Sequence, residues 1–190
     1  MFRIESYPKD VTLSDGTAIT LRPMVKEDEQ LLLSLFLAVP EQERWFLKED
    51  VTSPQTIRAW ADDLDYRRSL PLLALDKDGA IVADALLIRR RGGSRAHIGE
   101  LRVVVRPDFR GRGLGVTLLR ELCDIANDAG LEKVIIEVVE HEKDMLEAAE
   151  WMGFYRLAML DGLAKDQHGK DCALVIMVMP LGRYYEWSKF

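Results

Sequence analysis

The sequence predicts a single α/β domain in which strands and helices are mixed along the chain. Three observations lead to this prediction. The chain has 190 residues, which is close to the usual size of one globular domain. Hydrophobic residues make up 48% of it, enough to build a sizeable core. Segments with the two-residue period of strands alternate with segments that have the helical period of about 3.6 residues.

The N-terminal third predicts one strand and two helices. Residues Thr17–Arg22 follow a turn signal and alternate as a strand does. The leucine-rich residues Glu27–Val39 predict a helix that the following proline ends. A second helix is expected to start at Ser53-Pro54, because a capping residue is followed there by a first-turn proline.

The middle of the chain predicts an antiparallel meander. Two strands, Leu72–Asp76 and Ala80–Ile88, flank a Lys-Asp-Gly turn signal. A further strand over Ile98–Val105 follows a turn that is rich in arginine and glycine. Short connections of this kind join strands that lie next to each other in opposite directions.

At the start of the C-terminal half, the spacing of the hydrophobic residues changes from that of a strand to that of a helix. Leucines recur at helical spacing from Leu114, and Gly130 is a natural stop. The pattern then predicts, in order, a strand over Lys133–Val139, a helix over Asp144–Met152 and strands over Phe154–Leu160 and Cys172–Met179. The whole chain should therefore contain about seven strands and about four helices.

We expect one domain over residues 1–190, with a core from about residue 17 to residue 180. No internal repeat or change of composition indicates a second domain. Residues 181–190 form an aromatic tail that contains Tyr184, Tyr185, Trp187 and Phe190. Such a tail either covers the core of its own domain or meets another subunit, in which case the protein forms a homodimer.

Composition excludes several classes of protein. The net charge of −6 argues against a general nucleic-acid binder. No apolar run approaches the roughly 18 residues that span a bilayer, so no membrane is expected as a partner. The N-terminus has no signal-like apolar segment, and the cytoplasm is the expected location. Two cysteines and three histidines without metal-site spacing predict no metal.

Positive charge is concentrated in one stretch of this acidic chain. Residues 89–112 contain eight arginines but only two acidic residues, Glu100 and Asp108. A local basic stretch favours a small anionic ligand over a polyanion that wraps the surface. The alternative is an arginine-rich hairpin that is merely solvated.

The end of this stretch has the features of a site for a diphosphate. A strand leads into a glycine-rich loop, and a helix begins directly after it. The first turn of a helix has unpaired N–H groups and a partial positive charge, and glycines let a phosphate approach them. The loop does not match the P-loop of nucleotide hydrolases. A plain connection is the alternative. The candidate residues are Val103, Val104, Val105, Arg110, Gly111, Arg112, Gly113, Leu114 and Gly115.

These residues resemble the Arg/Gln-x-x-Gly-x-Gly/Ala signature of the GNAT superfamily of N-acetyltransferases. Val105-x-Pro107 before the loop and Gly153-Phe154 after a later helix stand at matching positions, and the resemblance covers about Thr17–Pro180. It implies a mostly antiparallel sheet with a central V-shaped splay that holds acetyl-CoA as co-substrate. The loop amides would hold the pyrophosphate, and the strand before the loop would pair with the pantetheine arm.

The resemblance also implies catalytic residues. An amine attacks a thioester only when neutral, so a general base is useful. Glu100 matches the position of the family's general base, and Glu137 is the alternative base. A structural salt bridge is the other interpretation of Glu100, and an exposed carboxylate that of Glu137. Ala149 replaces a tyrosine that serves many relatives as general acid, and Glu142 replaces an asparagine that commonly binds the coenzyme.

Within the superfamily, the sequence is most similar to the acetyltransferase domain of bacterial protein lysine acetyltransferases. The similar stretches are Leu13–Thr17, Leu21–Pro23, Glu27–Glu29 and Glu100–Gly115, and the likeness continues at Glu137-Val138 and Met145-Leu146. This closer resemblance implies a protein lysine as the acceptor. A small amine or an amino acid is the alternative acceptor, and a sensor that binds acyl-CoA without catalysis is an alternative function.

Overall fold

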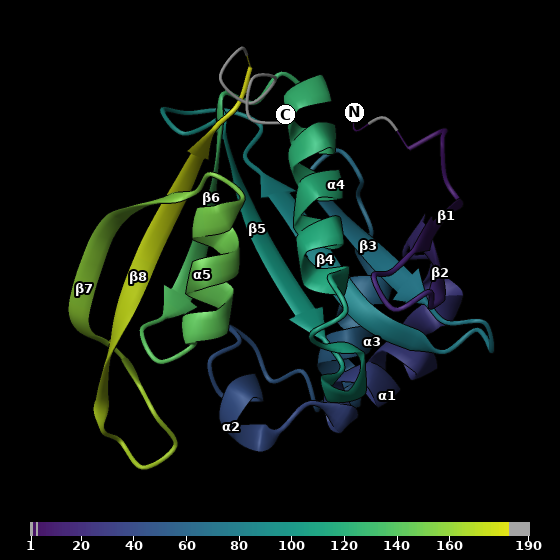
Figure 1. The fold of residues 1–190 in the computed structure, drawn as a ribbon, viewed down its shortest axis with the longest axis horizontal. Coiled ribbons are helices and arrows are strands. Elements are labelled where there is room, and N and C mark those ends of the chain that lie inside the picture. The colour runs from purple at the N-terminus through teal and green to yellow at the C-terminus, as the bar shows by residue number, and fades with distance from the viewer. Residues whose placement is uncertain (1, 3, 183–190) are drawn as a thin grey trace.

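One sheet organises the part of the chain that the computed structural model describes, which is residue 2 and residues 4–182. Its strands lie in the order β1-β2-β3-β4-β5-β6-β8-β7 (Figure 1). All neighbouring strands are antiparallel except β5 and β6, which are parallel. The strands are β1 (Lys9–Thr12), β2 (Ala18–Pro23), β3 (Ser69–Leu75), β4 (Ile81–Arg89), β5 (Ile98–Val105), β6 (Lys133–Val139), β7 (Tyr155–Lys165) and β8 (Asp171–Pro180).

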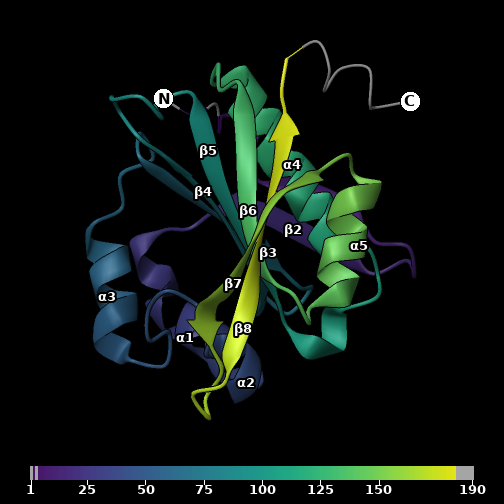
Figure 2. The ribbon, with the colours of Figure 1, turned by 90° about the vertical axis from the view of Figure 1, so that its left-hand side faces the viewer.

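Helices cover both faces of the sheet. Figure 2 shows α1 and α3 on one side of the strands and α4 and α5 on the other. Two short 3₁₀ turns, Lys26–Asp28 and Pro107–Phe109, precede α1 and the glycine-rich loop. The α-helices are α1 (Glu29–Ala38), α2 (Glu41–Arg44), α3 (Pro54–Asp62), α4 (Leu114–Asp128) and α5 (Lys143–Trp151).

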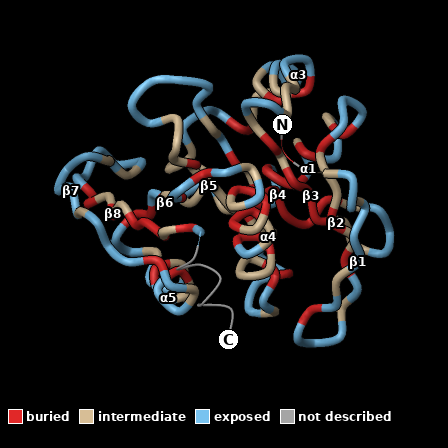
Figure 3. The backbone as a smooth tube through the Cα atoms, turned by 90° about the horizontal axis from the view of Figure 1, so that it is seen from above, coloured by how far each residue is buried: buried red, intermediate tan, exposed pale blue. Residues whose placement is uncertain are grey.

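The two faces of the sheet have separate hydrophobic cores, because successive side chains of a strand point to opposite faces. On β5, Leu101 packs with Leu118 and the other buried side chains of α4. Val104, on the opposite face, packs with Phe36 of α1 and Ile57 of α3. Figure 3 shows the buried residues gathered on the central strands, whereas the edge strand β7 is mostly exposed.

The mixed, mostly antiparallel fold that the sequence predicts is confirmed, and most element boundaries agree within a few residues. The predicted cap of α3 is also present, since the side chain of Ser53 accepts a hydrogen bond from the N–H of Thr56. The predicted residues Tyr184, Tyr185, Trp187 and Phe190 of the aromatic tail lie outside the described residues. No helix of the described part is both long and apolar enough to cross a membrane.

Three differences from the prediction have physical reasons. Strand β1 and helix α2 are each four residues long, too short for a hydrophobic period to reveal them. Strand β7 continues to Lys165 instead of ending at Leu160. Its Asp-Gly sequence resembles a turn, but it lies at an irregularity in the pairing with β8 between Leu160 and Ala164, so the strand continues past it.

Among the described residues, two carboxylates are buried, and each is paired with an arginine. Asp84 is 1% exposed and lies 2.7 Å from Arg102. Asp28 is 3% exposed, and the guanidinium of Arg22 donates two hydrogen bonds of 2.6 Å to its oxygens. Burial alone would raise the pKa of Asp28, but the bonds from Arg22 and from the N–H of Val25 hold that pKa below its usual value.

Asp28→Asn is expected to lower the free energy of unfolding by about 3 kcal/mol, because it leaves the Arg22 guanidinium without its charge partner. A depressed carboxylate pKa adds stability above the unfolded value of 3.8, and that stability is lost as the pH falls through the folded pKa. The difference in the free energy of unfolding between wild type and variant, measured by urea unfolding, should therefore become smaller in acid. The exposed Asp78 offers a control, since Asp78→Asn should change stability by less than about 0.5 kcal/mol.

Candidate active site

The parallel strands β5 and β6 separate along their length. They pair from Ile98 with Lys133 to Leu101 with Ile136, and no pairing follows, although β5 continues to Val105. Figure 1 shows the two strands diverging from this point. The predicted V-shaped splay is therefore present at the centre of the sheet.

Strand β5 directs unpaired backbone groups into the splay. The N–H of Arg106 donates to the carbonyl of Val82 in β4, at 2.9 Å. Backbone groups of successive strand residues point to opposite sides, so the N–H groups of Val103 and Val105 face β6. Val104 lies between them with its side chain in the α1 and α3 core. The predicted residues Val103–Val105 thus form one wall of the splay.

The glycine-rich loop lies at the open end of the splay, where β5 leads into α4. Gly111 and Gly113 have φ angles of 70° and 85°, in the left-handed region that favours glycine. Gly113 is the N-cap residue of α4, and no described side chain caps this helix end. The N–H groups of Leu114 and Gly115 in the first turn therefore remain available to an anion.

Two arginines hold the loop in place. Arg110 donates two hydrogen bonds to the carboxylate of Glu43, at 2.6 and 3.0 Å, and one to the carbonyl of Val105 at 2.9 Å. Arg112 lies 3.1 Å from Asp15 and donates to the carbonyl of Asp108 at 2.7 Å. Their carboxylate partners offset part of the positive charge that the sequence places beside the loop.

The structure brings both candidate bases together. Glu100 lies on β5 just before the strands separate, and Glu137 lies on β6 just after. Their side chains are 32% and 30% exposed, so a ligand can reach both. Arg102 pairs with Asp84 and not with Glu100, and Ile88 lies across from Glu100. The structural salt bridge that is the other interpretation of Glu100 is therefore not formed with Arg102; Glu100 instead pairs with Lys48.

Lys48 holds these two carboxylates. Its Nζ contacts Oε1 of Glu100 and lies 3.2 Å from Oε2 of Glu137. Burial lowers the pKa of the Lys48 ammonium, but the two carboxylates outweigh this effect and raise it. Sequence analysis missed Lys48, which lies outside any periodic segment and 52 residues before Glu100.

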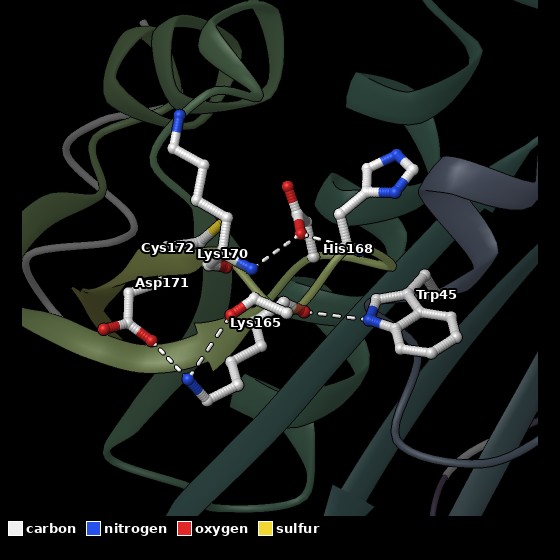
Figure 4. Close-up of polar contacts among 8 residues, drawn as sticks. Trp45, Lys165, His168, Lys170, Asp171 and Cys172 are labelled. Atoms are coloured by element: carbon white, nitrogen blue, oxygen red, sulfur yellow. Dashed lines mark hydrogen bonds and ion pairs between the residues drawn. The ribbon is translucent and has the colours of Figure 1, made fainter.

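The segment of residues 41–48, which we call the α2 segment, reaches across the open end of the splay. Glu43 binds Arg110 on the α4 side, and the ring of Phe46 packs edge-on against His141, with ring centroids 5.2 Å apart, on the β6 side. Trp45 Nε1 donates to the carbonyl of Lys165 at 2.8 Å, which ties the segment to the β7–β8 hairpin (Figure 4). This segment closes one side of the site.

The hairpin contact rests on an ordered turn. The carboxylate of Asp166 accepts hydrogen bonds of 2.9 Å from the N–H groups of His168 and Lys170. Lys165 and Asp171 form an ion pair of 2.6 Å at its base (Figure 4). These bonds fix the carbonyl that Trp45 contacts.

Glu142 precedes α5 at the open end of β6 and is half-buried. Burial raises the pKa of its carboxyl, and the nearby carboxylate of Glu43 adds to this, while His141 and Arg110 oppose it. Ala149 is fully buried in α5. The tyrosine that many relatives use as general acid therefore has no equivalent at that position.

Glu142→Gln is expected to stabilise the fold at pH 7. A raised carboxyl pKa means that the folded protein binds more protons than the unfolded chain, so stability falls as the pH rises from the ordinary value of 4.5 through the folded pKa. Glutamine does not titrate and avoids this loss. Urea unfolding should give the variant a higher free energy of unfolding than the wild type at pH 7, and a smaller difference at pH 4. Glu147→Gln, an exposed change on the same helix, should give no such advantage.

A cavity of about 800 Å³ lies on the face of the sheet that carries Glu100. Its lining includes Glu100, strand residues such as Ile135 and Ile176, and the arginine-rich turn between β4 and β5. In the described part of the chain, no three His, Cys, Asp or Glu side chains are grouped to hold a metal ion.

A splay with unpaired backbone groups, an uncapped helix start behind a glycine-rich loop and a pair of reachable carboxylates are the features of a domain of the acyltransferase class. A model described as the acetyltransferase (GNAT) family matches residues 37–154. The chain belongs to this family.

Known proteins agree with this assignment. Glucosamine 6-phosphate N-acetyltransferase of Trypanosoma brucei brucei is 35% identical over 88 residues, which are 44% of this chain and 58% of that protein. The chain thus matches little more than half the length of this relative.

Solved structures of two acetyltransferases have the same fold. The GNAT domain of S. lividans PAT has a TM-score of 0.74 and 22% identity, covering 91% of this chain and 96% of that one. A phosphinothricin acetyltransferase from Sinorhizobium meliloti, in complex with AcCoA, has a TM-score of 0.74 and 20% identity, covering 86% and 89%.

Proposed function

We propose that this protein is an acetyl-CoA-dependent N-acetyltransferase that transfers an acetyl group to a primary amine. The observation that carries the proposal is the start of α4. Gly113 is its N-cap residue, no described side chain caps it, and it lies at the wide end of the β5–β6 splay. A diphosphate at this helix start would direct the rest of the coenzyme into the splay. There the N–H groups of Val103 and Val105 would pair with the pantetheine arm or polarise the thioester carbonyl.

The proposed reaction is direct attack. The neutral amine nitrogen of the acceptor forms a bond to the thioester carbonyl carbon, and the bond from that carbon to sulfur breaks. Glu100 takes the proton of the amine, directly or through water, and Glu137 is the alternative base. Oriented binding of both substrates supplies a large part of the rate. The thiolate takes a proton from water, since Ala149 provides no acid.

Lys48 supports the placement of the amine. Its ammonium lies between Glu100 and Glu137, which shows that these carboxylates can bind a positively charged nitrogen at the point where the strands separate. The amine of an acceptor would take this place, with Lys48 moved aside. The acceptor would then be next to the coenzyme that we place in the splay.

Two acceptor classes remain within this proposal. A protein lysine is the acceptor that the closer resemblance implies, and the S. lividans PAT domain shares the fold. A small amine would fit in the open cavity of about 800 Å³ beside Glu100. The T. brucei relative is named for a small acceptor, an amino sugar phosphate.

The test is thiol release from acetyl-CoA by the purified protein, with mass spectrometry of the products. The acceptor panel would contain lysine peptides, polyamines, amino acids and glucosamine 6-phosphate. An acetylated amine is the expected product. Tight acetyl-CoA binding without any product would favour the sensor that binds acyl-CoA, and absent binding would defeat the assignment of the loop.

A further inference from the structure

The cavity beside Glu100 is lined by an excess of arginines. Five arginines contribute to its wall, against the three carboxylates of Asp63, Asp65 and Glu100. They come from the connection before β3, the last residue of β4 and the turn between β4 and β5. The arginines are Arg68, Arg89, Arg90, Arg91 and Arg95.

Internal contacts account for only some of these side chains. Arg91 lies 2.6 Å from the carboxylate of Asp65, and Arg89 donates to the carbonyl of Arg67 at 2.8 Å. The guanidiniums of Arg68, Arg90 and Arg95 have no carboxylate partner among residues 4–182. All three residues are exposed on the wall of the cavity, and a bound anion would offset their positive charge.

The carboxylate and the arginines lie at different places along the same wall. Glu100 on β5 lies directly across from Ile88 on β4. Arg90 follows Ile88 by two residues, which is about 7 Å at the rise of a strand. A small molecule can therefore place an amine at Glu100 and an anion at the arginines.

We propose that the acceptor is a small primary amine that also carries a phosphate or carboxylate group. Arg68, Arg90 and Arg95 bind this anionic group, and the amine faces Glu100. Guanidinium groups suit the task, because their planar N–H donors match the oxygens of phosphate and carboxylate. The inference rests on the proposed function, since it names the acceptor of that same site.

The first test compares acceptors that differ only in the anionic group. O-phosphoethanolamine is paired with ethanolamine, and 5-aminopentanoate with pentylamine, at saturating acetyl-CoA. The anionic member of at least one pair should have a KM at least about tenfold lower. The pair that shows the larger difference tells phosphate from carboxylate. Equal KM values within both pairs would overturn the inference.

The second test removes two arginines that have no carboxylate partner. The double variant Arg90→Gln/Arg95→Gln should raise the KM of the preferred anionic acceptor about tenfold or more, with kcat and the KM of acetyl-CoA unchanged. The matched neutral amine should be unaffected. Arg58→Gln, an exposed change on α3 outside the cavity lining, is the control. The same loss in the control would show a general charge effect and contradict the proposed site.

Calorimetry with the same anionic acceptors separates this inference from the proposed function. Binding that is lost in the double variant, without turnover of any amine, would keep the anion site and contradict the transferase. Turnover of lysine peptides or neutral amines, without binding of the anionic acceptors, would keep the transferase and overturn the anion site.

Discussion

A Gly113→Val variant is expected to fold and to bind acetyl-CoA about 100-fold more weakly than the wild type. The estimate corresponds to two lost hydrogen bonds to a charged group, each worth about 1.5 kcal/mol or more, with tenfold in affinity for each 1.4 kcal/mol. The physical reason is twofold. Gly113 has a φ angle of 85°, which β-branched residues rarely adopt, and a valine side chain would occupy open space at the helix start where we propose that the diphosphate binds.

The fold itself should tolerate this change. A Cβ at Gly113 would meet no atom within 4 Å, so the cost to folding is the backbone strain alone, about 1–3 kcal/mol. Gly79 provides a matched control, since it has a φ angle of 79° in the turn between β3 and β4 and equally open space around its Cβ. Gly79→Val should lose similar stability and keep acetyl-CoA binding.

Calorimetric titration with acetyl-CoA, together with urea unfolding, distinguishes the outcomes. Weak binding by folded Gly113→Val and normal binding by Gly79→Val would support the diphosphate site. Undiminished binding by folded Gly113→Val would place the coenzyme elsewhere. Equal loss of binding in both variants would mean that strain, and not access to the helix start, limits the affinity.

The glycine-rich loop could be predicted from the sequence because its signal is local. The end of β5, the glycines and the first turn of α4 all fall within residues 103–115, and a helix start has the same unpaired N–H groups in any fold. The V-shaped splay at the centre of the sheet followed from the resemblance, whereas the parallel pairing of β5 with β6 is seen only in the structure. The separation of the two strands is a property of backbone geometry, and no residue pattern within β6 predicts it.

The surroundings of the loop and the carboxylates could not be predicted, because they depend on contacts between distant segments. Glu43 is 67 residues from Arg110, and Trp45 is 120 residues from Lys165. The α2 segment has no hydrophobic period, and its helix has only four residues. Only the folded chain shows that its carboxylate contacts the glycine-rich loop, its indole contacts β7, and its ammonium contacts both β5 and β6.

The same holds for the two candidate bases. Sequence position placed Glu100 on the strand before the loop and Glu137 on another strand, as alternatives. The structure places both carboxylates around one ammonium, that of Lys48. They therefore lie in one candidate site, in which we propose that one carboxylate takes a proton while the other contributes negative charge nearby. Single and double substitutions must separate these roles.

Glu100→Gln is expected to lower kcat/KM at pH 7 by about 100-fold, the lower range for the loss of a general base. Acetyl-CoA binding should be unchanged, because the loop that we assign to the diphosphate is left intact. The acceptor amine, with a pKa near 10.4 for a lysine-like nitrogen, is almost wholly protonated at pH 7. A base matters less as the pH rises and more of the amine is neutral. The ratio of kcat/KM between wild type and variant should therefore become smaller toward pH 10.

The matched substitution Glu137→Gln decides which carboxylate is the base. If Glu100 takes the proton and Glu137 only contributes charge, Glu137→Gln should lower kcat/KM by less than about tenfold, and its effect should not depend on pH. The double variant should then resemble Glu100→Gln, because the base is already missing. The reverse pattern would identify Glu137 as the base. Unchanged pH–rate profiles in both single variants would leave proton removal to water, and the two carboxylates would serve to bind the acceptor ammonium.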